Sequence, residues 1–272
     1  MCFTYPIIAQ GNLEVFPKRT VFDGIENRAA TVYLNNTGKD TATYAISYIE
    51  IRMGEDGSFN SIENPQPNQQ FASPYLRYFP RTITLAPNGY QTVKIQLIKT
   101  NDLKQGEYRS HLYFRAIKKA TLLKKKAIDT VHHKTQGLNV NLLPVFGLSI
   151  ANIINIGDDT TTVQLTNLVL DKSQDDSVTL SLNVNRQGNR SAYGNVEVNH
   201  ISTEGITHKV ATVQGFAIYS PGTLLKTKIK LDNSKNIDYS KGELQVNFTT
   251  IDQSNHYAKA TLNLNQASLF FN

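Results

Sequence analysis

The chain has 272 residues, of which 40% are hydrophobic and 18% are charged, and its formal net charge is +6. This composition is that of a folded globular protein and excludes an intrinsically disordered chain. The length fits two domains of ordinary size, each able to bury its own core. No stretch contains the roughly 18 consecutive apolar residues that span a bilayer, so we expect no transmembrane segment.

The first ten residues, MCFTYPIIAQ, form an apolar stretch that contains the single cysteine of the chain, Cys2. We interpret residues 1–10 as the remnant of a secretory signal peptide that is cleaved near Gln10, which predicts an exported protein. The mature chain would then enter an oxidising compartment without a cysteine and without disulfides. An ordinary N-terminal strand and a lipid anchor on Cys2 are the two alternatives.

From Leu13 onward, apolar and polar residues alternate in short runs that end at turn residues, as is typical of half-buried β-strands. In the first half of the chain, the clearest runs cover residues 30–34, 43–51, 92–97 and 111–117. Turn signals separate the runs at 22–24, 35–38, 55–57 and 86–89. This spacing predicts a β-sandwich of the immunoglobulin type.

A basic segment follows the fourth run. Between Lys118 and Lys134 it holds six lysines and one acidic residue, Asp129. Taking these seven residues from the 28 basic and 22 acidic residues of the chain leaves 22 and 21, so the positive charge belongs to this segment. No aromatic side chains are interleaved to stack on bases, and we therefore expect no nucleic-acid partner. We expect a long loop, ending at Gln136, that is disordered in the free protein and becomes ordered with a partner.

After this loop the chain alternates again over residues 138–146, LNVNLLPVF. Asn139 and Asn141 lie on one parity of the run, and four apolar residues lie on the other. These apolar residues are Leu138, Val140, Leu142 and Phe146. Pro144 cannot donate the backbone hydrogen bond that a central strand requires, so we expect an edge strand here. We place the domain boundary near Gly147, with one domain at 11–147 and the other at 148–265.

The second half repeats the strand pattern without repeating the sequence. Its strand-like runs cover residues 162–165, 178–184, 194–198, 209–219, 226–231 and 243–250. No segment of the chain combines a helix start, an apolar stripe with a period of 3.6 residues and a helix stop. The sequence therefore predicts an all-β fold with two immunoglobulin-like β-sandwich domains in tandem.

Catalytic and metal-binding patterns are missing from the sequence. We find no nucleophile with a base, no carboxylate pair and no metal cluster at a recognisable spacing. His132 and His133 are adjacent and would point in opposite directions on an extended chain, while the other four histidines are isolated. The acidic pairs at 158–159 and 175–176 lie in turn-like surroundings and lack the alternating oxygen ligands of a calcium loop. We therefore expect no metal, no cofactor and no enzymatic activity.

Three stretches of the first half carry a family resemblance through their order and spacing. They are RTVFDG at 19–24, FPRTITLAP at 79–87 with QTVKI at 91–95, and GEYRSHLYFR at 106–115. Together they resemble the periplasmic pilus-assembly chaperones of the PapD-like family, whose paired immunoglobulin-like domains deliver fimbrial subunits to the outer membrane. The resemblance covers residues 13 to 148, and its weight lies in the joint order because each motif alone also occurs in other sandwiches.

The chain departs from the family pattern at two points. The penultimate strand of the family's first domain carries Glu-Ser and an asparagine, where this chain has Arg109-Ser110 and Ala116. The family also has a lysine in the strand after the long loop, where this chain has Leu143-Pro144. The cleft that grips a subunit's C-terminal carboxylate is then either incomplete or completed by another residue. The resemblance implies a divergent member of the family.

The resemblance implies a periplasmic chaperone that binds incomplete immunoglobulin-like subunits of a pilus or other surface appendage. A subunit that lacks its last strand has an open apolar groove and an unpaired sheet edge, which favour aggregation. An edge strand with alternating apolar side chains supplies both the backbone hydrogen bonds and the groove filling, which is donor-strand complementation. The candidate donor residues are Leu138, Val140, Leu142 and Phe146. Packing of these residues into the core of their own domain is the alternative.

The match at 19–24 makes Arg19 the candidate anchor for the partner's C-terminal carboxylate. A guanidinium can give a carboxylate two parallel hydrogen bonds and stays charged near neutral pH. A surface arginine beside Lys18 is the alternative. The resemblance also implies an outer-membrane usher as a second partner. The rival function is that of a structural or adhesive cell-surface protein, because a sandwich fold alone does not decide between the two roles.

Overall fold

The computed structural model describes residues 13–117, 146–172, 177–232 and 237–264. Contacts divide the chain into two compact units. The first unit comprises Met1–Ile49, Tyr75–Ile98 and His111–Asn152, and the second comprises Glu50–Pro74, Lys99–Ser110 and Ile153–Asn272. Two long strands, β10 (Gly106–Ile117) and β11 (Gly147–Ile156), contribute residues to both units.

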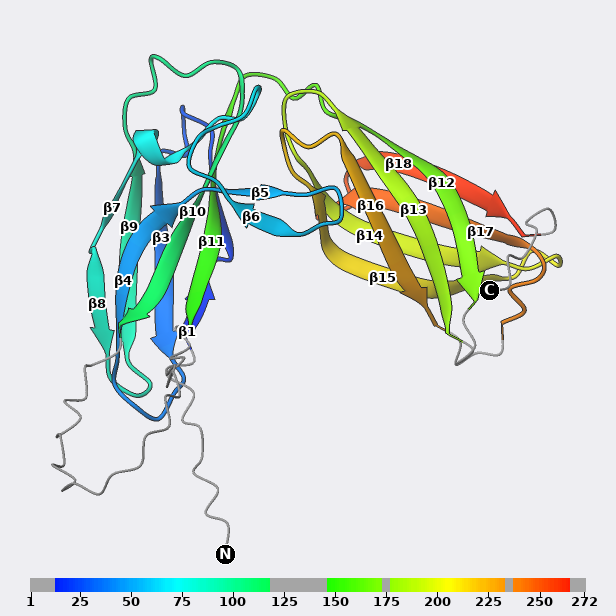
Figure 1. Cartoon of the computed structure of the whole chain (residues 1–272), viewed down its shortest axis with the longest axis horizontal. Coiled ribbons are helices and arrows are strands. Elements are labelled where there is room, and N and C mark those ends of the chain that lie inside the picture. Colours follow the sequence, from blue (N-terminus) through cyan, green and yellow to red (C-terminus); the bar gives the residue numbers. More distant parts are fainter. Residues whose placement is uncertain (1–12, 118–145, 173–176, 233–236, 265–272) are drawn as a thin grey trace, which may run out of the picture. The chain divides into compact units, whose positions relative to one another are not determined.

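Two sheets build the first unit (Figure 1). One has the strand order β1-β3-β9-β7, with β1 at Leu13–Phe16, β3 at Ala29–Asn36, β9 at Tyr90–Leu97 and β7 at Leu76–Phe79. The other has the order β2-β11-β10-β4-β8, with β2 at Arg19–Phe22, β4 at Ala42–Ile49 and β8 at Thr82–Leu85. A short 3-10 turn, η1 (Ser73–Tyr75), precedes β7.

Alternation along these strands explains the core of the first unit. In β3 and β9 the residues of one parity, such as Val32 and Val93, are completely buried, and the residues between them face solvent. The other sheet contributes Phe22 from β2 together with Leu112 and Phe114 from β10, all three fully buried. A strand with one face buried has its register fixed, because a slip of one residue would expose every apolar side chain.

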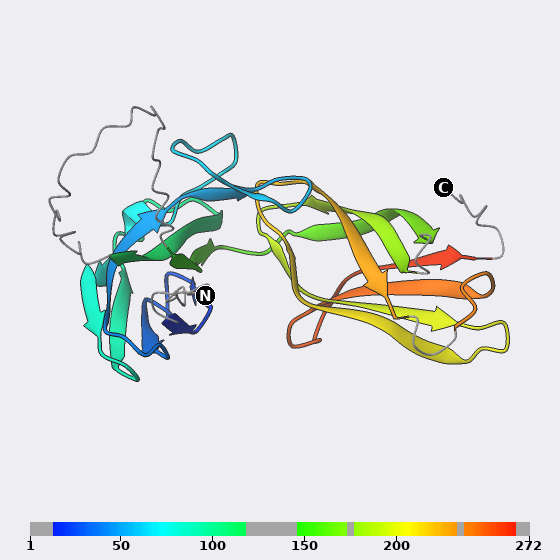
Figure 2. The same ribbon diagram turned by 60° about the horizontal axis from the view of Figure 1, so that its bottom comes forward.

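The second unit also contains two sheets, which form two layers (Figure 2). The three-stranded sheet has the order β12-β13-β16, with β12 at Thr162–Lys172, β13 at Val178–Gln187 and β16 at Leu224–Leu231. The four-stranded sheet has the order β15-β14-β17-β18, with β15 at Thr207–Ile218, β14 at Ala192–Ile201, β17 at Glu243–Thr250 and β18 at His256–Asn263. A separate hairpin pairs β5 (Ile51–Met53) with β6 (Phe59–Ser61).

The core of the second unit forms between these two layers. Leu180 and Val184 of β13 are completely buried, as are Leu244, Val246 and Phe248 of β17. Burial alternates along the whole of β13 and β14, with every second residue buried. The hairpin is attached to this core through Met53, which packs against it, and through the backbone of Lys226, whose N–H donates to the carbonyl of Glu55 at 2.7 Å.

One edge of the three-stranded sheet carries a row of lysines. β16 is the last strand of that sheet, and its side chains alternate between the core and solvent. Leu225, Ile229 and Leu231 are buried, whereas Lys226, Lys228 and Lys230 are exposed. The carboxylate of Glu55 pairs with the Lys226 ammonium at 3.0 Å. Basic side chains at this place are a common way to keep a sheet edge from pairing with other strands.

The prediction of an all-β chain with two β-sandwiches in tandem is confirmed. The predicted runs match strands of the structure, except that the run 43–51 covers β4 and reaches the first residue of β5 across a break at Glu50, and the run 209–219 extends one residue beyond β15. Among the described strands, those outside the predicted runs are β1, β2, β6, β7, β8, β11 and β18. In β18 the core-facing side chains include two alanines, Ala258 and Ala260, and none of the side chains of this strand is fully buried, so its apolar pattern is weak. The proposed signal remnant at 1–10 and the basic segment at 118–136 lie outside the described residues, and the domain bounds 11–147 and 148–265 stay a prediction.

Candidate functional site

Arg19 lies in β2, which forms one edge of the five-stranded sheet next to β11. Thr20 and Phe22 point into the core, so Arg19 and Val21 lie on the outer face, where Arg19 is half-buried and Val21 is 43% exposed. The Asn152 side-chain amide of β11 donates to the Thr20 hydroxyl and ties the two strands together. The structure thus has Arg19 on the strand beside β11, and its role as an anchor stays a prediction.

Phe146 and the start of β11 form the second part of the candidate site. Phe146, Leu148 and Ile150 share one parity, but they differ in burial: their exposed fractions are 56%, 36% and 2%. The carbonyl of Phe146 accepts a hydrogen bond from the N–H of Ala116 in β10 at 3.1 Å, so the backbone here is already paired with the sheet. The row of apolar side chains thus enters the core at Ile150 and is exposed before it.

Gly147 allows a close approach between β11 and a side chain of β10. A Cβ atom built on Gly147 would collide with the ring and the hydroxyl of Tyr113. Tyr113 lies on the outer face of β10, opposite Ser47 of β4, and Arg115 and the 41%-exposed Ile117 follow it on the same face. The glycine therefore lets the tyrosine ring lie against the strand, because a larger residue would push the ring away.

The other candidate donor residues cannot be compared with the structure. Leu138, Val140 and Leu142 lie outside the described residues, and so does Pro144. Of the four predicted donor side chains, Phe146 alone is described. The described residues of β11 run between β2 and β10 within the sheet, and the predicted edge strand at 138–146 directly precedes them.

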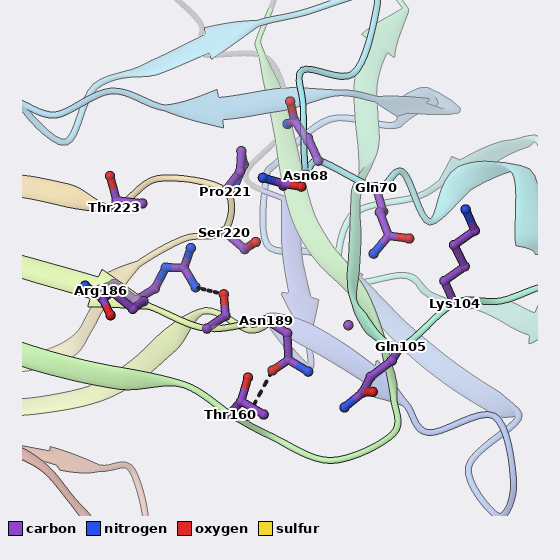
Figure 3. Close-up of a pocket in the computed structure, with 14 residues that line it drawn as sticks. Asn68, Gln70, Lys104, Gln105, Thr160, Arg186, Asn189, Ser220, Pro221 and Thr223 are labelled. Carbon is purple, nitrogen blue, oxygen red and sulfur yellow. Dashed lines mark hydrogen bonds between the residues drawn. The ribbon is translucent and has the colours of Figure 1, made fainter.

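The second unit contains a polar cavity of about 670 Å³, a size that is usual for small-molecule sites. Figure 3 shows Gln70, Lys104 and Gln105 on one side of it, with Arg186 and Asn189 on the other. Carboxamide side chains dominate the lining, and some of them are held in place: the Asn189 amide donates to the carbonyl of Asp158 at 2.8 Å. Small-molecule sites are lined mainly by apolar groups, so we assign no ligand to this cavity.

A buried ionic network lies in the same unit and was missed by sequence reasoning. The carboxylate of Glu107 accepts hydrogen bonds from Arg109 Nε at 2.9 Å and from the backbone N–H of Ser191 at 2.8 Å. The Ser191 hydroxyl donates to the same carboxylate at 2.6 Å. The Arg109 guanidinium also lies 4.0 Å from the centre of the Tyr219 ring, a cation–π contact. The network joins segments that are far apart in the sequence.

The electrostatics of this network stabilise the ionised form of Glu107. Burial raises the pKa of the Glu107 carboxyl, but the Arg109 charge and the hydrogen bonds from Ser191 outweigh it, so the pKa lies below its usual range. Arg186 is 3% exposed and donates to the carbonyls of Gly222 and Gly188 at 2.8 and 3.0 Å. Burial lowers the pKa of Arg186, with the charge of Glu107 acting in the opposite direction.

A second buried carboxylate behaves differently. The Ser110 hydroxyl donates to Glu50 at 2.8 Å and accepts a hydrogen bond from the N–H of Ser73 at 2.8 Å. Burial raises the pKa of Glu50, and these hydrogen bonds only partly offset the effect. The second oxygen of the Glu50 carboxylate is buried without a hydrogen-bond partner among the described residues. No neighbouring positive charge is among the causes that set the pKa of Glu50.

The described part of the chain contains neither a candidate metal site nor a candidate membrane-spanning helix. No three histidine, cysteine or acidic side chains there come together in a way that could hold a metal ion. Within the same ranges, no helix has the length and apolar character needed to cross a bilayer.

Comparison with known proteins gives matches among solved structures. No family model matches the sequence. No curated protein matches it either. The class 5 fimbriae chaperone CfaA is 12% identical, with a TM-score of 0.44 over 93% of this chain and 98% of that chain. The Pseudomonas aeruginosa chaperone CupB2 is 13% identical, with a TM-score of 0.42 over 92% of this chain and 100% of that chain. The E. coli chaperone DraB is 10% identical, with a TM-score of 0.42 over 94% of this chain and 98% of that chain.

These solved structures are chaperones, and CfaA is named as a fimbriae chaperone. The sequence motifs described above resemble the same class of protein.

Proposed function

We propose that this chain is a periplasmic chaperone that binds incomplete immunoglobulin-like subunits of a pilus or another surface appendage. Two independent observations support the proposal: the order of the motifs in residues 13 to 148, and the exposed apolar row at the start of β11. The proposed domains are 11–147 and 148–265. The chain acts by binding and carries out no chemical reaction.

The apolar row at the start of β11 is the observation that carries the proposal. Ile150 fills the core of the first unit, whereas Leu148 and Phe146, which precede it on the same parity, are exposed to solvent. A strand that packed all of its apolar residues into its own domain would bury these two as well. The row continues toward the N-terminus in sequence through Leu142, Val140 and Leu138. We infer that these residues extend it as the donor row.

Donor-strand complementation follows from this arrangement. A subunit without its last strand needs backbone partners along one sheet edge and apolar side chains to fill the groove between its sheets. Burying one fully exposed leucine or phenylalanine contributes about 1.5–3 kcal/mol. A row of four such side chains can therefore offset the translational and rotational entropy that is lost on association and still hold a subunit firmly. An outer-membrane usher that takes over the subunit is the second partner in this proposal.

Export and co-purification test the proposal in the source cells. An affinity-tagged chain should fractionate with the periplasm and bring down, in equal amounts, a protein whose sequence encodes a sandwich that lacks one strand. Replacing Leu138, Val140 and Leu142 together with serine should abolish this capture without changing the thermal midpoint. A chain found outside the cell and free of such a subunit would instead be a structural or adhesive protein.

A single substitution gives a sharper comparison at the described end of the row. Phe146→Ser should weaken capture of the subunit by about tenfold, the effect of removing one buried anchor. Phe59→Ser is the matched control, because Phe59 is exposed to the same degree, 54% against 56%, and lies on β6. Equal capture by the two variants would contradict the proposed role of Phe146. A collapsed fold in the triple variant would show that those residues belong to the core.

A further inference from the structure

Four aromatic side chains are exposed on the outer face of the sheet β1-β3-β9-β7. They are Phe16 of β1, Tyr33 of β3, Tyr90 of β9 and Phe79 of β7, with exposed fractions of 71%, 56%, 76% and 75%. The outer face of a two-layer sandwich normally carries polar residues, since only its inner face has to be buried. We call this surface the aromatic face.

The register of the strands places these rings close to one another. Phe16 lies directly opposite Tyr33, and Tyr33 lies opposite Thr92 of β9. Tyr90 is two residues from Thr92, which makes it a diagonal neighbour of Tyr33. Phe79 lies opposite Lys94, the next outward residue of β9 on the other side of Thr92. The rings of Phe16, Tyr33 and Tyr90 are therefore neighbours, and Phe79 lies on the same face beyond Thr92 and Lys94, on a sheet whose strands lie side by side in Figure 1.

The area of the aromatic face fits a protein interface. At about 200 Å² per ring, these exposed fractions correspond to about 550 Å² of aromatic surface. That is at the upper end of the largest apolar patches on monomeric proteins, which are often functional. Two such faces together with the polar side chains between the rings exceed the roughly 1,000 Å² that a specific interface buries.

Charges of both signs flank the rings on opposite sides of the aromatic face. Glu14 lies on β1, at one edge of the sheet, while Lys94 and Arg77 lie on β9 and β7 toward the other edge. A face with acid on one side and base on the other is complementary to itself under a two-fold rotation that exchanges the two edges.

We propose that the aromatic face binds a second copy of this chain to form a two-fold symmetric dimer. The rings supply the apolar centre of the interface, and Glu14 of each copy lies near the basic β7–β9 side of the other. This face is on the opposite sheet from β11, so a dimer leaves the exposed row at Phe146 open. The inference is independent of the proposed function.

Sedimentation equilibrium of the full chain over a wide range of concentrations tests the dimer. The parent protein should show a monomer–dimer equilibrium. Tyr33→Ser, or Phe16→Ser, should raise the dimer dissociation constant by at least about tenfold, because each substitution occurs twice in a two-fold interface. Phe59→Ser on β6 is the control and should leave the constant unchanged. Circular dichroism and the thermal midpoint confirm that each variant is folded.

Charge exchange tests the orientation of the two copies. Glu14→Lys alone and Arg77→Glu alone should each weaken the dimer, and the double variant should regain most of the loss because the opposite charges are restored. A parent chain that stays monomeric at every concentration would overturn the proposal. So would a dimer that survives Phe16→Ser with Tyr33→Ser, or one weakened equally by Phe59→Ser. Loss of subunit binding in these variants, with no dimer in the parent, would assign the face to another occupant and would also overturn it.

Discussion

Arg19 is the residue whose proposed role is easiest to test in isolation. It lies in β2 beside β11, on the outer face of the sheet. A charge-assisted hydrogen bond to a carboxylate contributes about 1.5–3 kcal/mol, so Arg19→Ala should weaken partner binding about ten- to a hundredfold if it anchors the partner's C-terminus. Affinity for the captured subunit, measured by titration calorimetry, gives the comparison.

Two controls separate anchoring from a general charge effect. Lys18→Ala removes a neighbouring positive charge and should change the affinity very little, because exposed charges contribute weakly. A subunit amidated at its C-terminus should bind the parent chain weakly and lose nothing further with Arg19→Ala. Equal losses on amidation in parent and variant would show that the carboxylate is bound elsewhere.

The pKa shifts of Glu107 and Glu50 predict opposite dependences of the free energy of unfolding on pH. The pKa of Glu107 is lowered in the folded chain, so its contribution is present above the unfolded pKa of about 4.3 and is lost as the pH falls through the folded pKa. The pKa of Glu50 is raised by burial, so folding is penalised as the pH rises from the unfolded pKa through the folded one.

Glutamine substitutions should separate these two carboxylates. At neutral pH, Glu107→Gln should lower the free energy of unfolding by about 3 kcal/mol, because it leaves the buried Arg109 charge without its partner. Glu50→Gln should instead raise the stability of the chain. The Glu50 difference should disappear as the pH falls through the folded pKa to about 4.3, whereas the Glu107 difference should shrink only below about 4.3. Urea unfolding from about pH 2 to about pH 7 measures both differences, and two curves with the same sign would contradict the assignment.

At the scale of single strands, the contact between β10 and β11 depends on Gly147. Gly147→Ala places a Cβ against the Tyr113 ring and should destabilise the first unit by about 1–3 kcal/mol. Tyr113→Ala combined with Gly147→Ala should recover most of this loss, since it removes the colliding group. Denaturant unfolding of the two single variants and the double variant measures the coupling, and strictly additive effects would show that the two residues do not interact.

Strands were predictable where one face is strongly apolar. The runs at 30–34, 92–97 and 178–184 are strands because every second residue fills the core. β18 was missed because Ala258 and Ala260 make only a weak apolar pattern on its inner face. The proposed donor row rests on the same parity. The exposure of Phe146 required coordinates, because alternation alone does not distinguish a strand that fills its own core from one that fills a partner's groove.

Long-range polar contacts were beyond sequence reasoning for a different reason. Glu107 and Arg109 stand two apart on one strand, and this spacing puts them on the same face of β10. That spacing was the one available signal for the network. Ser191, which completes it, lies 84 residues from Glu107 and carries no pattern of its own. The aromatic face was likewise hidden, since it emerges when the registers of four strands are combined.

At the scale of the whole molecule, two separate cores predict two unfolding transitions. Val93 of β9 and Val246 of β17 are both completely buried, one in each unit. Val93→Ala and Val246→Ala should each cost about 2 kcal/mol and lower one calorimetric midpoint by roughly 5–10 °C, while the other midpoint stays in place. If each substitution lowers both midpoints equally, the units unfold together and the cores are energetically coupled.

The lysine row on β16 limits where strands can be added to this molecule. A strand that approached this edge would meet three ammonium groups spaced about 7 Å apart, since alternate residues of a strand repeat at that distance. Apolar segments would have to strip water from those groups, and basic segments would be repelled. A chain whose first unit binds an unpaired subunit would therefore not add further strands at the β16 edge of its second unit. When this chain is mixed with an aggregation-prone subunit, the two should form complexes of limited size and not fibres.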